Sequence, residues 1–156
     1  MEGCVMAGQT EHEQLAISAR DFRFYAFDAL GGGHSITEMV QMISRGFLSG
    51  KVIRLAAEYH IPEPLLQRTL HISPSTFQRR KRGGRFTADE SDRFVRLVGL
   101  YGMAEDVLGS KRDGSEWMSA PNRSLGGVSP AEFAITETGA REVEELLGRI
   151  AHGVVA

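Results

Sequence analysis

The sequence predicts an all-α protein, and two observations carry this prediction. Helix-start signatures recur along the chain, in which a Ser or Thr cap is followed by Pro or, three residues later, by Glu; they stand at Ser35, Ser73, Thr87 and Ser129. Strand signals are nearly absent, because the brief aromatic alternation at 22–27 has no second segment to pair with.

Apolar residues at helical spacing define the predicted elements between these caps. The predicted helices lie at 35–46, 52–59, 62–70, 74–82, 88–108, around 116–118, at 130–135 and at 140–152. In the helix predicted at 35–46, the side chains of Met39, Val40 and Ile43 are expected to face the core. Residues 1–30 are predicted to form an arm, disordered over 1–10 and a weak helix or ordered segment over 11–30, ended by Gly31–Gly33.

Composition excludes several classes of protein. The chain has 156 residues, 42% of them hydrophobic, and no apolar run approaches the roughly 18 residues that a membrane helix needs. One cysteine, Cys4, excludes an internal disulfide, and five scattered histidines argue against a structural zinc site. We therefore expect a cytosolic protein with no metal site, no cofactor and no membrane partner.

The formal net charge of −2 conceals a strong segregation of charge. Residues 1–34 carry two basic and five acidic residues (net −3), residues 35–87 nine and three (net +6), and residues 88–156 seven and twelve (net −5). The densest basic stretch runs from Arg79 to Arg85. Such a cluster is either a solvated helix end or a nucleic-acid contact, and the pattern of the surrounding residues is needed to distinguish the two.

Residues 62–82 have the layout of a helix-turn-helix. An apolar helix ends at Leu70, the tight turn 71–73 contains the hydrophobe Ile72, and a second helix begins at Pro74 with Phe77 facing inward. The alternative is a helical hairpin with a basic corner. The outward side chains of the second helix, with Arg85 beyond it, are of the types that contact base edges and phosphates. The predicted DNA-binding residues are Ser73, Ser75, Thr76, Gln78, Arg79, Arg80, Lys81, Arg82 and Arg85.

One recognition helix covers only a few base pairs of operator DNA, so the protein is expected to bind as a homodimer. The aromatic segment 22–27 is a candidate for the surface between the two subunits. No pairing of His with Ser or Cys suggests a nucleophile, so the chain is not expected to be an enzyme. Trp117 is expected in the core. Asp92 and Arg93 are expected to form ion pairs that fix the long helix against the basic middle.

A series of motifs follows the basic cluster. Glu90-Ser91-Asp92-Arg93-Phe94 is followed by Trp117, Pro121-Asn122, Leu125-Gly126-Gly127 and Ser129-Pro130, and the chain ends with Thr136-Glu137-Thr138-Gly139-Ala140 and a helical repeat to Gly153. This series resembles the Xre/MbcA/ParS-like antitoxins, partners of RES-domain toxins, over residues 32–156. Gly114 is a departure, because the family often has Ala three residues before the Trp.

The resemblance implies two modules divided near residues 83–87: an Xre-like helix-turn-helix domain at 31–86 that represses its own operon, and a toxin-binding domain at 87–156. It also implies that the C-terminal tail covers the active-site cleft of an NAD-consuming toxin, in a higher-order complex. The implied toxin-binding residues are Glu145, Leu147, Arg149, Ile150, His152, Gly153, Val154, Val155 and Ala156. Without the resemblance, a frayed terminus would explain this tail equally well. The rival functions are a stand-alone transcription regulator without a toxin and an antitoxin that has lost DNA binding.

Overall fold

The computed structural model describes residues 22–31 and 35–154, and the fold of this part is all-α, as predicted. The only β-type pairing among these residues is an isolated bridge between Leu48 and Arg85. The helices are α2 (Phe22–Ala29), α3 (Ile36–Arg45), α4 (Ser49–Glu58), α5 (Glu63–Leu70), α6 (Pro74–Lys81), α7 (Ala88–Leu108), α8 (Lys111–Ser119), the 3-10 helix η1 (Arg123–Leu125), α9 (Pro130–Phe133) and α10 (Glu137–Ala151).

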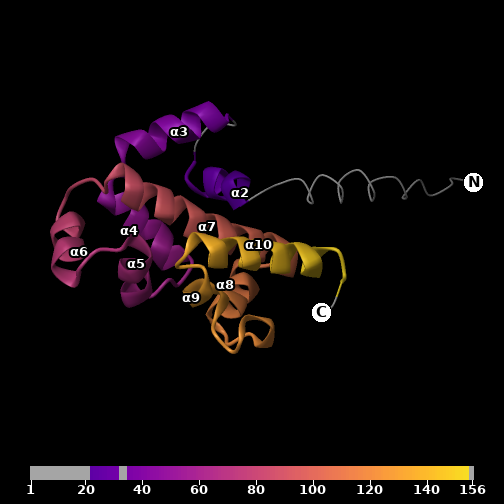
Figure 1. The fold of residues 1–156 in the computed structure, drawn as a ribbon. Helices are drawn as coiled ribbons and strands as arrows, with labels where there is room; N and C mark the ends of the chain where they lie inside the picture. Colours follow the sequence, from indigo (N-terminus) through magenta and orange to yellow (C-terminus); the bar gives the residue numbers. More distant parts are fainter. Residues whose placement is uncertain (1–21, 32–34, 155–156) are drawn as a thin grey trace, which may run out of the picture.

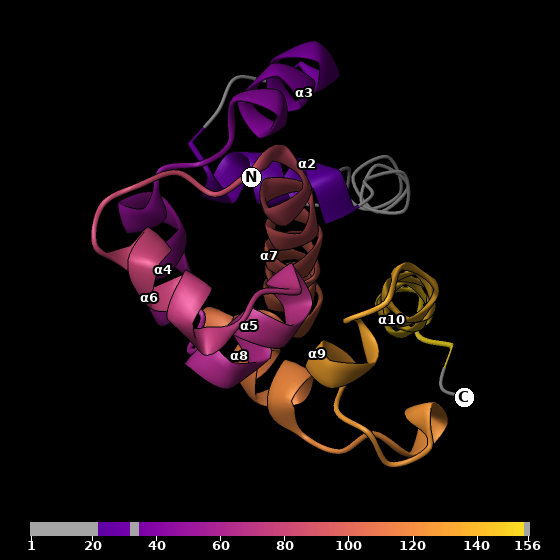
Figure 2. The same ribbon diagram turned by 60° about the vertical axis from the view of Figure 1, so that its left-hand side comes forward.

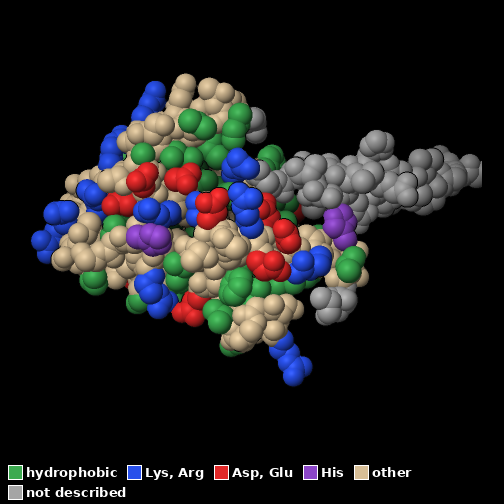
Figure 3. Space-filling view, viewed as in Figure 1, with side chains coloured by type: hydrophobic (Ala, Val, Ile, Leu, Met, Phe, Trp, Pro, Cys, Tyr) green, Lys and Arg blue, Asp and Glu red, His purple; other side chains and the backbone are tan. Residues whose placement is uncertain are grey.

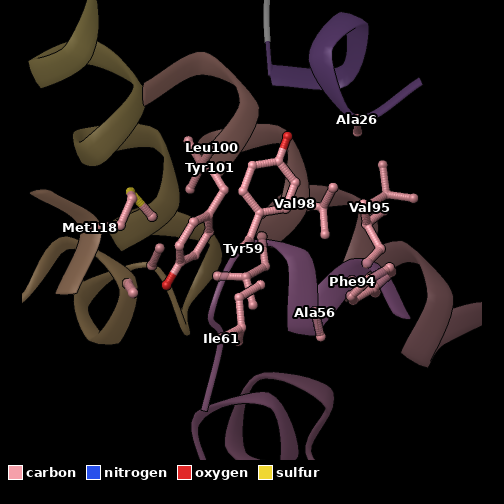
Figure 4. Packing of buried hydrophobic residues seen from close by; sticks show 14 of the residues in the cluster. Ala26, Ala56, Tyr59, Ile61, Phe94, Val95, Val98, Leu100, Tyr101 and Met118 are labelled. Atoms are coloured by element: carbon pink, nitrogen blue, oxygen red, sulfur yellow. The ribbon is translucent and has the colours of Figure 1, made fainter. Parts of the chain in front are cut away.

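The 21-residue helix α7 is the axis of the molecule (Figure 1). It contacts α2, α3, α4 and α5 as well as α8 and α10, and Figure 2 shows the other helices ranged around it. Twelve of its residues are buried, among them Phe94, Val98 and Tyr101. Figure 4 shows these side chains meeting Tyr59 of α4 and Met118 of α8 in one cluster. The N-terminal and C-terminal helices therefore share one hydrophobic core.

A partly buried hydrogen bond ties the C-cap residue of α4 to α7 at the edge of this core. The Tyr59 hydroxyl donates a hydrogen bond of 3.1 Å to a carboxylate oxygen of Glu105. Burial and the neighbouring carboxylate raise the pKa of Tyr59 above its ordinary value, so the hydroxyl keeps the proton that it donates.

The predicted caps account for most of the helix starts. Ser73, Thr87 and Ser129 each accept a backbone N–H three residues on, and Thr87 with Glu90 forms a complete capping box. Ser35 accepts from Thr37 instead of forming the predicted box. The last helix begins at Glu137 under the cap of Thr136, three residues before its predicted start.

Residues 22–29 form helix α2, which agrees with the weak helix predicted within 11–30. Tyr25, Ala26 and Phe27 are buried, so half of the six residues of the candidate dimer surface belong to the core, whereas Phe24 is 43% exposed. One prediction about α3 is wrong. Val40, expected inward on α3, is 55% exposed. The predicted disorder of residues 1–10 and the position of Cys4 lie outside the described residues.

Three glycines set the spacing between α7 and its neighbours. A Cβ at Gly99 would meet the carbonyl oxygen of Phe22, and one at Gly102 would lie 2.9 Å from the Cβ of Tyr25. A Cβ at Gly114 of α8 would lie 2.6 Å from the backbone nitrogen of Glu105. Gly114, the departure from the family pattern, therefore brings α8 close against the backbone of α7.

We expect Gly99→Ala to destabilise the protein by about 1–3 kcal/mol, because the added methyl group must push α2 away from α7. Urea denaturation followed by circular dichroism would measure this change. Gly148→Ala in α10 is the matched control: its Cβ meets nothing within 4 Å, so the higher helix propensity of Ala should stabilise by up to about 1 kcal/mol. Equal effects of the two substitutions would contradict the close packing of α2.

Candidate functional site

Helices α5 and α6 form the predicted helix-turn-helix, with residues 71–73 as the turn. His71 ends α5 in the left-handed conformation, with φ 56°, and the Ile72 N–H donates to the carbonyl of Gln67. Phe77, 1% exposed, anchors the inner face of α6, and its ring centroid lies 6.3 Å from that of Phe86. The outer face of α6 is thereby fixed toward solvent.

The N-terminus of α6 carries a cluster of hydroxyl groups. Ser73 accepts the Thr76 N–H at 3.2 Å, and its own hydroxyl lies 3.1 Å from that of Ser75 and 3.0 Å from that of Thr76. Ser73 and Ser75 are exposed, whereas Thr76 is half-buried. Hydroxyls and free amides at a helix start are suited to a phosphate oxygen.

Arg79 of α6 and Arg82, the C-cap residue of this helix, are exposed cations. Neither forms an ion pair with another described residue. Figure 3 shows Lys and Arg side chains gathered at the left edge of the molecule, where α6 lies. An unpaired guanidinium on an exposed helix face has all of its donors available to an anion.

Glu63, in the first turn of α5, binds two of the predicted DNA-binding residues. Its carboxylate accepts from Gln78 at 2.7 Å and from Lys81 at 3.1 Å. Both side chains are exposed, but each gives one donor to this carboxylate, which therefore competes with DNA for them. The only sign of this arrangement in the sequence is the acidic residue at the start of the helix.

Arg80 does not lie on the outer face. Its guanidinium pairs with Glu90 at 3.3 Å, and the two side chains are 25% and 8% exposed. The other oxygen of Glu90 accepts the Thr87 N–H at 2.8 Å, which completes the capping box. The assignment of Arg80 to phosphate contact is therefore corrected: this side chain connects α6 to the first turn of α7. Arg85 is exposed, but it donates to the carbonyl of Gly46 at 2.8 Å.

The residues next to Glu90 also attach α7 to the helix-turn-helix part. The Ser91 hydroxyl accepts the Phe47 N–H at 3.0 Å, and Arg93 donates to the carbonyl of Leu70 at 3.3 Å, at the end of α5. Asp92 pairs with Arg96 on its own helix. The prediction that Asp92 and Arg93 form ion pairs with the basic middle is therefore wrong for Asp92, and Arg93 binds a backbone carbonyl instead of a carboxylate.

A hollow of about 460 Å³ lies at the surface where α2, α3, α7 and α10 meet. Glu145, one of the predicted toxin-binding residues, is exposed at its edge. Four carboxylates and three arginines line the hollow together with apolar groups. Such a mixture of charged and apolar side chains is suited to hydrogen bonds and ion pairs with another protein.

The end of α10 carries most of the predicted toxin-binding residues. Leu147 is fully buried in the core, so its assignment to a contact surface is corrected. Arg149 pairs with Glu142 at 3.2 Å and Ile150 is half-buried, whereas His152 is exposed. Val155 and Ala156 lie outside the described residues.

A Schellman motif fixes the direction of the chain after α10. Gly153 has φ 68°. The Val154 N–H donates to the carbonyl of Arg149 at 2.9 Å and the Gly153 N–H to that of Ile150 at 3.0 Å. These two hydrogen bonds set the position of Val154, which is 56% exposed.

Other chemistries find no support within residues 22–31 and 35–154. No group of three or more His, Cys, Asp or Glu side chains gathers there as a metal site would require. No helix of this part is long and apolar enough to cross a membrane.

These features define an all-α protein with a helix-turn-helix followed by an acidic helical module. A sequence model described as the antitoxin Xre-like helix-turn-helix domain matches residues 38–99. A second, described as the antitoxin Xre/MbcA/ParS C-terminal toxin-binding domain, matches residues 103–153.

Three curated relatives carry the same name. The chain is 39% identical over 120 residues to Antitoxin Xre of Yersinia enterocolitica, covering 76% of this chain and 81% of the relative. It is 31% identical over 153 residues to Antitoxin Xre of Pseudomonas putida, and this match covers 93% of this chain and 95% of the relative. It is 45% identical over 83 residues to Antitoxin Xre of Photorhabdus laumondii, and this match covers 52% of this chain and 56% of the relative. The chain belongs to the Xre antitoxin family, and it is therefore not an enzyme, as predicted.

The two family matches meet inside α7, between residues 99 and 103, whereas the predicted division between the modules lies near residues 83–87. The first half of α7 lies in the helix-turn-helix match and the second half in the toxin-binding match. Helix α7 is thus common to both modules.

We expect Arg80→Met to lower stability by roughly 2 kcal/mol, because Glu90 would keep a buried carboxylate oxygen without its cation. The melting temperature should then fall by roughly 4–8 °C in differential scanning calorimetry. Arg141→Met is the matched control, since Arg141 belongs to an ion pair that is 73% and 66% exposed and contributes little. Equal shifts for the two variants would contradict a structural role for the Arg80–Glu90 pair.

Proposed function

We propose that this antitoxin neutralises a RES-type, NAD-consuming toxin with its C-terminal module and binds operator DNA with α6. The observation that carries the DNA part is the outer face of α6, with exposed hydroxyls at its start and, beyond them, Arg79 and Arg82, which form no ion pair within the described part of the chain. Arginine contacts guanine edges and phosphates, and an exposed helix of this kind fits a major groove.

The toxin part of the proposal is supported by the toxin-binding family model over residues 103–153 and by the direction of the tail. The net charge of −5 over residues 88–156 complements a cleft that binds anionic NAD and so carries basic groups. Val154 continues away from the Schellman motif as a small apolar side chain, which can enter such a cleft. The choice of a RES-type toxin rests on the family resemblance.

The regulatory part of the proposal is autorepression by a dimer in the cytoplasm. One recognition helix covers few base pairs, so two copies are needed to bind two half-sites about one helical turn apart. The dimer would hold both copies of α6 on one face of the duplex. Bound toxin would add to this assembly at the opposite module.

The alternative is a stand-alone regulator that uses the same helix-turn-helix and has no toxin partner. The absence of a RES-like gene beside this one would favour it. An antitoxin without DNA binding is a third possibility, and the available guanidinium groups of Arg79 and Arg82 argue against it.

We expect the double substitution Arg79→Ala with Arg82→Ala to weaken DNA binding roughly five- to a hundredfold. It should also reduce the slope of log K against log salt by about 0.9 for each lost phosphate contact. Fluorescence anisotropy with labelled duplexes from the region upstream of its own gene would measure both. Arg112→Ala with Arg123→Ala removes the same charge from the other module and should change neither value. DNA binding that is equal in both double variants would contradict the role of α6.

We expect Val154→Asp to abolish or strongly reduce rescue when the antitoxin is co-expressed with the adjacent toxin gene, because a carboxylate would be desolvated in the cleft. Cell growth and intracellular NAD are the readouts, and DNA binding should be unchanged. Val40→Asp is the control of matched exposure, 55% against 56%. Full rescue by Val154→Asp would refute entry of the tail into the cleft.

A further inference from the structure

A second basic surface lies beside α6, at the start of α4. A groove of about 720 Å³ is lined by Lys51, Arg54 and Arg85, together with the turn at Gly83 and Gly84 that follows α6. A smaller hollow of about 230 Å³ adjoins it and adds Arg45. No carboxylate lines either hollow in the described part of the chain, in contrast to the mixed hollow beside α10.

Backbone bonds fix this groove relative to α6. The Ser49 N–H donates to the carbonyl of Gly84 at 3.0 Å, and the Gly84 N–H donates to the Ser49 hydroxyl at 3.3 Å. Leu48 and Arg85 form the isolated bridge of the structure. The start of α4 and the end of α6 therefore form one rigid unit.

The cations of the groove have few competing partners. No described residue forms an ion pair with Arg45 or Lys51, and Arg54 has only an exposed contact of 4.0 Å with Glu58. Leu48, the N-cap of α4, provides no side-chain cap, so the positive end of the α4 dipole adds to the same field. Arg85 keeps its position through the Gly46 carbonyl.

We infer that this groove binds the sugar–phosphate backbone of duplex DNA next to the major groove entered by α6, with Lys51, Arg54 and Arg45 as phosphate contacts. The inference rests on the proposed DNA binding and extends it to a surface outside the helix-turn-helix. A major groove about 12 Å wide has a phosphate strand along each side. A helix in that groove therefore has phosphates near its ends, and the hollow beside Gly83–Gly84 lies at the C-terminal end of α6. These contacts would add affinity without sequence preference.

The test compares the wild-type protein with a double variant that carries both Lys51→Gln and Arg54→Gln. The probe is a labelled 30-bp duplex of mixed sequence, and anisotropy titrations run from 50 to about 200 mM salt, the range in which phosphate contacts are resolved. We expect the slope of log K against log salt to fall by about 1.8, from two lost phosphate contacts. With an unchanged intercept at 1 M, that is a roughly sixtyfold loss of affinity at 0.1 M salt.

The matched control is Arg112→Gln with Arg123→Gln, which makes the same change in net charge on the other module and should leave the slope unaltered. Arg85 is left intact because its loss would release the Gly46 carbonyl. Circular dichroism melting checks that the double variant is folded. A variant with unaltered slope overturns the inference, whether or not its affinity falls, and so does a defect confined to toxin rescue.

The two proposals fail in distinguishable ways. If Arg79→Ala with Arg82→Ala weakens binding and the Lys51 and Arg54 changes do not, the groove is excluded and DNA binding by α6 stands. If wild-type protein binds neither this duplex nor upstream DNA, DNA binding itself is refuted, and the groove inference with it.

Discussion

The carboxylate of Glu90 has two partners at the start of α7, and the attachment of α6 to this central helix depends on them. One oxygen accepts the Thr87 N–H and closes the capping box, while the other pairs with Arg80 of α6. Because the side chain is 8% exposed, neither bond is easily replaced by water. The first turn of the long helix and the orientation of α6 are therefore set by the same group.

The Glu90–Phe94 motif, which carries much of the family resemblance, has a common structural explanation. Ser91 accepts the Phe47 N–H, Arg93 binds the end of α5, and Phe94 is buried in the core. The motif thus attaches α7 to the N-terminal helices through the ion pair of Glu90, the hydrogen bonds of Ser91 and Arg93 and the packing of Phe94. Because α7 runs from Ala88 to Leu108, the same helix continues into the acidic module.

Capping residues and apolar periodicity predicted most of the helices. They could not predict contacts between side chains that are far apart in the sequence. The capping residues Thr87 and Ser129 and the apolar spacing of α4 and α5 gave helices close to the observed ones, because caps and periodicity act within one turn. The sequence could not show that Arg80 faces Glu90, since their pairing depends on how α6 lies against α7. Leu147 was assigned to a surface by position in the family, yet its helical phase places it in the core.

The separation of charge along the chain gives the molecule an electric polarity. Helix α6, which carries part of the basic cluster, and helix α10 lie on opposite sides of the molecule in both ribbon views (Figures 1 and 2). For a molecule that binds DNA as proposed, the phosphates attract the side of α6 and repel the acidic module, so a large part of the orientation is set before contact. The approach to DNA then leaves the tail of α10 facing solvent, where a partner protein has free access to it.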